Sequence, residues 1–380
     1  MKTRIHQLHE LGQSVWCDNL SRRMIESEGE GPHRGLRGMI RAGIVGVTSN
    51  PTIFMKAITG SRDYDRSMGG LIAQGRDVHE VYEGLVLADI ADAADLLRPT
   101  HEQSNGLDGF VSLEVNPKLA YDTQGTIDEG RRLFSQLNRP NVLIKVPATH
   151  EGIPAVERLI SEGVNVNITL IFSLELYENV MQAYLSGLRR RAAAGGELSR
   201  VASVASFFVS RVDTLVDKLL KEKRNTGANV DELLGQAAVA NAKVAYALFE
   251  EVFAPEGAFR ELAARGARVQ RPLWASTSTK DPTYPDTKYV DNLIGENTVN
   301  TLPGETISAV LDHVRVATTL REDRESARTV FRRLADVGID FNAVTEKLLA
   351  DGVAAFAQSF DELLAAIAKK QDELRPMAVR

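Results

Sequence analysis

Residues 141–148 read Asn-Val-Leu-Ile-Lys-Val-Pro-Ala, a short apolar run rich in β-branched residues that contains one charge, Lys145. A run of this kind that closes at a proline predicts a buried parallel strand rather than a helix. Side chains alternate along a strand, so Lys145 shares its face with Leu143 and lies opposite to Ile144. Burial among apolar neighbours disfavours an ammonium, and a neutral amine attacks carbonyls to form a Schiff base. This stretch alone leaves two other interpretations open: an exposed edge strand, or a lysine paired with a carboxylate.

Seven further apolar runs predict the other strands of the sheet. They lie at residues 14–18, 43–50, 110–115, 164–171, 201–208, 272–276 and 298–301. Segments with helical spacing separate them, and strands that alternate with helices predict right-handed βαβ units in a parallel sheet. With eight strands and eight helical connections we predict a single (β/α)8 TIM barrel with additional helices over residues 1–380. A doubly wound open sheet is the second choice.

Helical signals add finer predictions. Ser173 is expected to cap a helix that runs to Arg191, and Thr-Ile-Asp-Glu at residues 126–129 predicts a capping box that opens another helix. A long helical region over residues 53–97 is expected to be closed by Pro99 and by the Ser104-Asn105-Gly106 turn. Residues 341–369 predict a long C-terminal helix, and residues 370–380 are expected to fray.

Composition excludes several classes of protein. The net charge of −6 argues against general nucleic-acid binding, although a local basic site for a phosphorylated ligand stays open. The one cysteine, Cys17, rules out an internal disulfide and a cysteine-based metal cluster, and the seven histidines show no ligand spacing, so we expect no metal. The sequence has no glycine-rich phosphate-binding loop after a strand, so we expect no nucleotide cofactor. Without a signal core or a spanning apolar run, we expect a cytoplasmic protein that binds no membrane.

Polar residues stand at the C-terminal ends of seven of the eight predicted strands. They are Asp18, Asn50, Glu114, Lys145, Asn167 with Thr169, Ser206 and Ser276. Catalytic groups of such barrels lie at this end of the strands. Two carboxylates allow two separate acid–base tasks next to Lys145, and the neutral side chains suit sugar hydroxyls and a bridging water. Singly, each of these residues is equally well explained as a buried polar group bonded to backbone.

A phosphate group needs cations or free backbone amides. Arg211 follows the sixth predicted strand at a helix start and is the best candidate, with a solvated surface arginine as the alternative. Ser276, Ser278 and Lys280 follow the seventh strand, where phosphate sites recur in barrels.

At these residues the sequence resembles the transaldolases, in the longer form found in bacteria. The resemblance rests on five motifs that span most of the chain: GVTSNPTIF at residues 46–54, VSLEV at 111–115, VLIKVP at 142–147, NVNITLIF at 165–172 and ASFFVSR at 205–211. It implies a class I aldolase barrel that forms a Schiff base and uses no cofactor. The sequence departs from many members of the family after the seventh strand. There, Ser276-Thr-Ser278 stands in place of Ser-x-Arg, and Lys280 is the nearest cation. Lysine offers phosphate a point charge but not a bidentate fork.

The resemblance also implies roles for individual residues. Lys145 would form the Schiff base, and Asp18 would be the acid–base group for bond cleavage. Glu114 and Thr169 would hold the catalytic water, and the three-carbon unit would be bound by Asn50, Asn167 and Ser206. Arg211 and Ser276 would bind phosphate, with Lys280 as a weaker candidate.

The implied reaction belongs to the non-oxidative pentose phosphate pathway. It moves a dihydroxyacetone unit from sedoheptulose 7-phosphate to glyceraldehyde 3-phosphate, giving erythrose 4-phosphate and fructose 6-phosphate. The alternatives are a fructose 6-phosphate aldolase that releases free dihydroxyacetone, and a catalytically silent sugar-phosphate-binding barrel. Members of the aldolase branch carry a tyrosine where this chain has Phe208, which favours the transferase. A monomer and a homodimer both remain open.

Overall fold

Eight parallel strands close into a barrel in which each strand pairs with its neighbours in chain order. The computed structural model describes residues 2–27, 35–224 and 230–378. The strands are β1 (Gln13–Cys17), β2 (Gly46–Val47), β3 (Phe110–Glu114), β4 (Val142–Pro147), β5 (Val166–Ile171), β6 (Ser203–Phe208), β7 (Arg271–Ala275) and β8 (Thr298–Leu302). The predicted (β/α)8 barrel is therefore confirmed.

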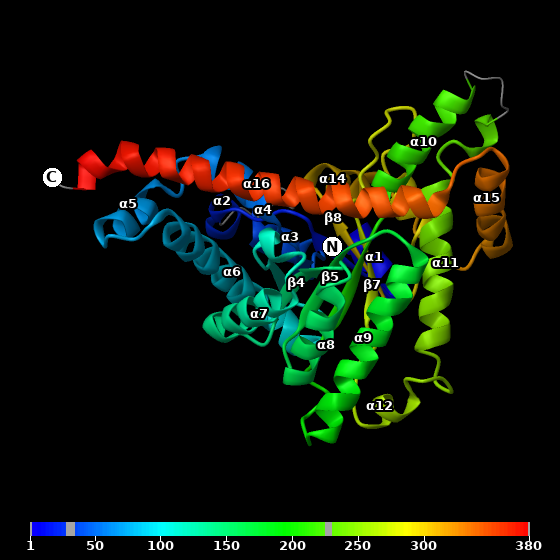
Figure 1. Cartoon of the computed structure of the whole chain (residues 1–380), viewed down its shortest axis with the longest axis horizontal. Coiled ribbons are helices and arrows are strands. Elements are labelled where there is room, and N and C mark those ends of the chain that lie inside the picture. Colours follow the sequence, from blue (N-terminus) through cyan, green and yellow to red (C-terminus); the bar gives the residue numbers. More distant parts are fainter. Residues whose placement is uncertain (1, 28–34, 225–229, 379–380) are drawn as a thin grey trace.

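Helices surround the barrel and extend beyond it (Figure 1). They are α1 (Arg4–Glu10), α2 (Arg22–Glu26), α3 (Leu36–Arg41), α4 (Pro51–Thr59), α5 (Asp65–Ala73), α6 (Val78–Gln103), α7 (Thr123–Leu137), α8 (Gly152–Glu162), α9 (Leu174–Ala193), α10 (Ser210–Arg224), α11 (Ala237–Val252), α12 (Arg260–Ala264), α13 (Lys288–Asn292), α14 (Gly304–His313), α15 (Arg324–Asp336) and α16 (Phe341–Ala378), with short 3₁₀ turns η1 (Pro117–Leu119) and η2 (Asp231–Leu233). Within the described ranges, none of these helices is both long and apolar enough to cross a bilayer.

The register of the barrel sets polar residues side by side at one end. Glu114 pairs with Lys145 across β3 and β4, and Lys145 pairs with Asn167 across β4 and β5. Every residue of β4 and β5 is buried. Lys145 therefore lies on a central strand, and the edge-strand interpretation is wrong.

The second strand is much shorter than predicted. Only Gly46 and Val47 pair as a strand, and Asn50 instead caps α4 by accepting a hydrogen bond from the Ile53 amide at 3.0 Å. A side chain at Gly46 has no room, because a Cβ there would lie 2.5 Å from the Trp16 indole. Close packing of Trp16 under this segment explains why glycine stands at the start of β2.

Helix boundaries differ from prediction around residues 53–103. The long helical region forms α4, α5 and α6, and α6 continues one turn past Pro99 to Gln103, where the predicted Ser104-Asn105-Gly106 turn ends it. A proline inside a helix costs roughly 3 kcal/mol. The turn after Pro99 is held by tertiary contacts, because the His101 ring packs 4.9 Å from the Phe110 ring and its Nδ1 is hydrogen-bonded to the Asp108 carbonyl at 2.9 Å.

The two predicted helix caps have opposite outcomes. Ser173 caps α9 as predicted, since its hydroxyl accepts from the Leu176 amide at 3.1 Å. The capping box at residues 126–129 is wrong, because α7 begins earlier, with Asp122 as its cap. Thr126 lies inside α7 and donates to the Leu119 carbonyl at 2.9 Å.

The C-terminal helix α16 runs across the molecule from the region of α10 and α15 to α5 (Figure 1). It packs against α4, α5, α6, α10 and β5. α16 continues to Ala378, beyond the predicted helix end at residue 369. At the start of the segment expected to fray, Lys370 donates to the carbonyls of Ile58 and Ser61 and to Asp65, and Gln371 donates to the Arg76 carbonyl. Fraying of the residues after Gln371 stays a prediction. Residues 379–380 lie outside the described part.

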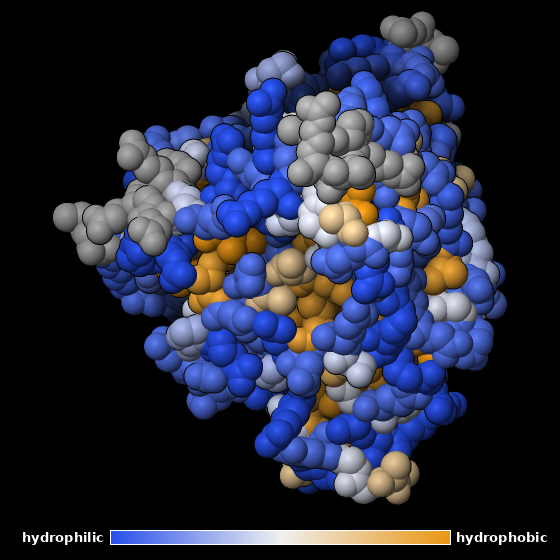
Figure 2. Space-filling view, turned by 90° about the vertical axis from the view of Figure 1, so that its left-hand side faces the viewer, coloured by the Kyte–Doolittle hydropathy of each residue, from blue (hydrophilic) through white to orange (hydrophobic). Residues whose placement is uncertain are grey.

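Figure 2 shows the end of the molecule where α16 meets α5. Hydrophilic residues dominate this face, and apolar side chains are visible mainly in the recesses between them. The apolar residues of α16 that face the protein include Leu363 and Ile367, both fully buried. The helix is thus part of the folded domain rather than an appendage.

Candidate active site

A cavity of about 650 Å³ opens at the C-terminal ends of the strands. The predicted site residues that line it are Asp18, Asn50, Lys145, Thr169, Ser206, Phe208, Arg211, Ser276 and Lys280. The other two, Glu114 and Asn167, are buried beside Lys145 in the sheet. The fold therefore brings together residues that lie up to 262 positions apart, from Asp18 to Lys280.

Lys145 is 4% exposed, and its amine reaches the cavity. Its Nζ donates to the Ser49 carbonyl at 3.2 Å and lies 3.7 Å from Glu114 Oε2. The Phe356 ring of α16 has its centroid 5.7 Å from the same Nζ. A primary amine held by one hydrogen bond, one carboxyl group and an aromatic ring is restrained enough to be aimed at a ligand in the cavity.

Glu114 differs from a surface carboxylate because it is buried. Burial raises the pKa of Glu114 to about 7, although the Lys145 ammonium opposes the shift. Its Oε2 makes no hydrogen bond to the described protein, and neither does the buried hydroxyl of Thr169. A carboxyl group with a pKa near neutrality can both donate and accept a proton, as general acid–base catalysis requires.

Asp18 follows β1 directly and faces the cavity. Thr48 donates to its Oδ1 at 2.7 Å and is also hydrogen-bonded to the Thr301 hydroxyl at 2.7 Å. Burial raises the pKa of Asp18, and Lys145, Lys280 and Arg211 oppose this through their charges. Thr48 thus orients Asp18. The sequence analysis did not assign Thr48 to the site, although Thr48 lies in the motif at residues 46–54.

Asn167 is tied to two serines inside the barrel. Its amide nitrogen donates to Ser112 Oγ at 3.0 Å, and Ser206 Oγ donates to its Oδ1 at 2.7 Å. These bonds fix the orientation of the amide and of the Ser206 hydroxyl next to Lys145.

Two further cations, Arg211 and Lys280, line the cavity. Arg211, on the first turn of α10, places its guanidinium 5.4 Å from the centroid of the Phe208 ring, and burial lowers its pKa. In the part of the chain that the structure describes, no carboxylate lies within 4.0 Å of this guanidinium. Lys280 donates to Ser278 Oγ at 2.5 Å, and Ser276 shares a 2.9 Å hydrogen bond with Ser210.

Several residues that line the cavity were not predicted from the sequence. Among them are Phe356 of α16, more than 200 positions after Lys145, and Lys56 of α4. Among the described residues, no group of three His, Cys, Asp or Glu side chains is arranged to hold a metal ion.

Comparison with known proteins identifies the family of the chain. The family model described as Transaldolase/Fructose-6-phosphate aldolase matches residues 15–367. The chain is 45% identical to "Transaldolase 2" of Nostoc sp. and to "Transaldolase" of Trichodesmium erythraeum, covering 98% of both chains in each case. It is 46% identical to "Transaldolase" of Saccharopolyspora erythraea, also with 98% of both chains covered. The chain therefore belongs to the transaldolase/fructose-6-phosphate aldolase family, and its relatives group it with the transaldolases.

Proposed function

We propose that this transaldolase transfers a dihydroxyacetone unit from sedoheptulose 7-phosphate to glyceraldehyde 3-phosphate through a Schiff base on Lys145. The products are erythrose 4-phosphate and fructose 6-phosphate. One observation carries the proposal: Lys145, buried in the sheet, lines the same cavity as Asp18 and Arg211.

Schiff-base formation begins with attack of the Lys145 amine on the C2 carbonyl of the ketose. The resulting carbinolamine loses its hydroxyl as water, with a proton from Glu114, and leaves an iminium ion. Glu114, with a pKa of about 7, is matched to giving and taking this proton near neutral pH. Thr169 and Glu114 each offer a buried polar atom that no described protein group occupies, which suits holding the water.

Carbon–carbon cleavage follows on the iminium. Asp18 takes the proton of the C4 hydroxyl, the C3–C4 bond breaks, and its electron pair moves into the iminium to give an enamine. The aldose phosphate leaves, and the acceptor aldehyde takes its place. The enamine carbon attacks the acceptor carbonyl, Asp18 returns a proton to the new hydroxyl, and water releases the ketose from Lys145.

Substrate binding follows the polarity of the cavity. Asn50, Asn167 and Ser206 are proposed to hold the hydroxyls of the three-carbon unit near Lys145. Arg211 and Ser276, with Lys280 as a further cation, are proposed to hold the phosphate at the far end, where charge-assisted hydrogen bonds are strong.

Borohydride trapping tests the covalent step. Incubation with fructose 6-phosphate and borohydride should reduce the iminium and leave a three-carbon unit on Lys145, located by peptide mass mapping. Lys243 is a matched internal control, since it is similarly buried but lies outside the cavity, and it should stay unmodified. An adduct on another lysine, or none at all, would contradict the proposal.

The aldolase alternative depends on water and protons reaching the enamine. Phe208 lines the cavity and packs against Phe172, with 5.2 Å between ring centroids. An apolar ring at this position favours transfer over release.

We further propose that the enzyme acts on free sugar phosphates in the cytoplasm. Light scattering distinguishes a 41.6 kDa monomer from a homodimer.

A further inference from the structure

We infer that Asp213 and Asp217 of α10, with Tyr284, Lys288 and Tyr289, act as positioning residues for the phosphate end of the active site. The inference rests on the proposed phosphate role of Arg211, Ser276 and Lys280. These phosphate residues come from two separate elements: Arg211 from α10, and the others from the loop between β7 and α13. Something must hold the two elements at a fixed separation for them to bind one phosphate.

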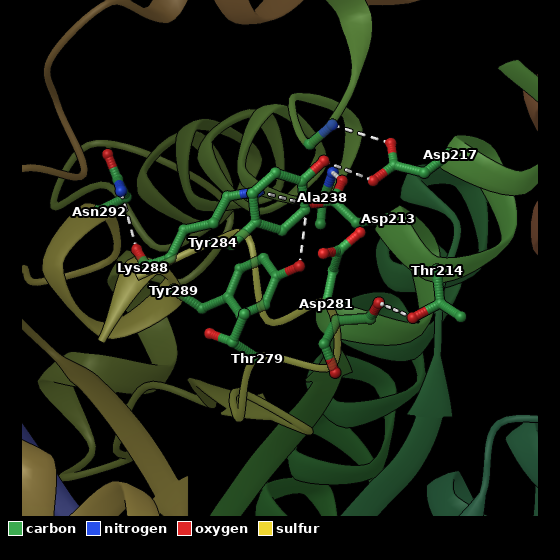
Figure 3. A network of polar contacts seen from close by, with 12 residues as sticks. Asp213, Thr214, Asp217, Ala238, Thr279, Asp281, Tyr284, Lys288, Tyr289 and Asn292 are labelled. Atoms are coloured by element: carbon green, nitrogen blue, oxygen red, sulfur yellow. Dashed lines mark hydrogen bonds and ion pairs between the residues drawn. The ribbon is translucent and has the colours of Figure 1, made fainter. Parts of the chain in front are cut away.

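Helix α10 presents Arg211 on one side and the aspartates Asp213 and Asp217 on another. Asp213 and Asp217 are one turn apart and are 1% and 5% exposed. Because each residue turns an α-helix by about 100°, Arg211 projects on nearly the opposite side from Asp213. Arg211 therefore faces the active-site cavity, whereas the two aspartates face the loop and α13 (Figure 3).

The two aspartates bind several groups from other elements. Asp213 accepts from the Ala238 amide at 2.7 Å, from the Tyr289 hydroxyl at 2.9 Å and from Lys288 Nζ at 3.0 Å. Their burial makes each lost partner costly, because a buried charge without its hydrogen bonds is strongly disfavoured.

Asp217 makes the second connection. It accepts from the Tyr284 hydroxyl at 2.7 Å and from the Gly235 amide at 2.8 Å. Lys288 Nζ lies 3.7 Å from the centroid of the Tyr284 ring, so the two connections are joined to one another. The junction is closely packed, since a Cβ on Gly235 would lie 2.5 Å from Lys288 Nζ.

The loop that carries Lys280 is attached at both ends. At its start Ser276 is bonded to Ser210 at 2.9 Å, and near its end Tyr284 is bonded to Asp217. Between them, Thr279 donates to the Pro285 carbonyl at 2.9 Å. Lys280 itself borders both the active-site cavity and a second cavity lined by Asp213, Asp217 and Tyr284. Asp281 is also paired with Lys221 of α10 at 3.4 Å, but that pair is partly exposed to solvent. Loss of the buried attachment at Tyr284 should therefore let Lys280 move relative to Arg211.

The test compares phosphorylated and non-phosphorylated donors in Tyr284→Phe and Asp217→Asn. We expect KM for fructose 6-phosphate to rise about fivefold to tenfold, the size of one lost hydrogen bond. The kcat for fructose 6-phosphate and the kcat/KM for fructose should stay within about twofold, because neither change touches the reacting atoms. Inhibition by inorganic phosphate should weaken by the same factor as KM rises.

Controls separate positioning from general damage. Tyr184→Phe loses a comparable bond, to the Arg268 carbonyl at 2.8 Å, just before β7 at the other end of the barrel, and should change none of these values. If Asp217→Asn does not fold, Tyr284→Phe and Lys288→Met carry the test. Equal losses with both donors, or no change in KM and phosphate inhibition, would overturn the inference.

Arg211→Ala shows which claim fails. If this substitution raises KM selectively for fructose 6-phosphate and Tyr284→Phe does not, the positioning role is wrong and the phosphate site stands. If Arg211→Ala has no selective effect, the phosphate site is wrong, and the inference falls with it.

Discussion

Lys145 and Glu114 form a pair in which each residue determines the chemistry of the other. They are neighbours in register, buried, and 3.7 Å apart. The carboxylate interpretation left open for Lys145 is therefore partly right, since a carboxyl group does lie beside it. That group has a raised pKa, so it is poised to exchange protons rather than to serve only as a fixed counter-charge.

The raised pKa of Glu114 predicts a pH-dependent cost to stability. An unfolded glutamate ionises near 4.3, whereas Glu114 in the fold ionises at about 7. Between these values the folded state binds more protons than the unfolded state, so stability falls as pH rises, by at most roughly 4 kcal/mol in total. Urea unfolding of the wild type and Glu114→Gln at pH 5 and pH 8 measures this. The variant should lose less stability across the interval; parallel losses would contradict the raised pKa.

Phe208 gives a prediction about the fate of the enamine. The wild type should form little free dihydroxyacetone from fructose 6-phosphate alone and turn over rapidly once erythrose 4-phosphate is added. Phe208→Tyr introduces a hydroxyl that can donate a proton and anchor water, so release should increase. Phe207→Tyr is the matched control, because Phe207 is the neighbouring buried ring but packs against Trp274 and does not line the cavity. Rapid release by the wild type without an acceptor would favour the aldolase.

Among the elements, the strands were predictable and the path of α16 was not. A closed parallel barrel follows from eight buried runs with helices between them, and the ends of parallel strands meet at one edge. Thus Asp18, Glu114 and Lys145 could be grouped without coordinates. An amphipathic helix shows which face is buried, but not which surface it covers. The sequence therefore did not indicate that Phe356 lines the cavity. The helix end expected at Pro99 was also wrong, because tertiary contacts outweighed the local free-energy cost of a proline inside α6.

Helix α16 is expected to limit access of water to Lys145. Phe356 is 5% exposed and lines the cavity, so Phe356→Ala should lower stability by about 3–5 kcal/mol and also increase release of dihydroxyacetone. Leu363→Ala on the same helix is the control, since Leu363 is fully buried away from the cavity and should affect stability alone. Denaturant melts and an acceptor-free release assay give both values. Unchanged release in Phe356→Ala would show that α16 does not shield the intermediate.

Taken whole, the molecule has a net charge of −6 but concentrates cations at one end of the barrel. Four cations, Lys56, Lys145, Arg211 and Lys280, line the same cavity as two carboxyl groups, Asp18 and Glu305. A cavity with walls of low dielectric focuses such charges, which suits a phosphorylated ligand on an otherwise acidic protein. The barrel supplies the rigid frame, and the contacts between α10 and the β7–α13 loop keep the cationic end in one arrangement.

The whole chain is also expected to work without a metal ion. In the proposed reaction the iminium on Lys145 takes up the electron pair of the broken bond, which is the task a Lewis-acidic metal performs in other aldolases. Within residues 2–27, 35–224 and 230–378, no cluster of His, Cys, Asp or Glu has the arrangement of a metal site. Prolonged dialysis against EDTA should therefore leave kcat and KM unchanged, while borohydride with fructose 6-phosphate still inactivates the dialysed enzyme. Loss of turnover that a divalent ion restores would show that a metal, and not Lys145 alone, stabilises the carbanion.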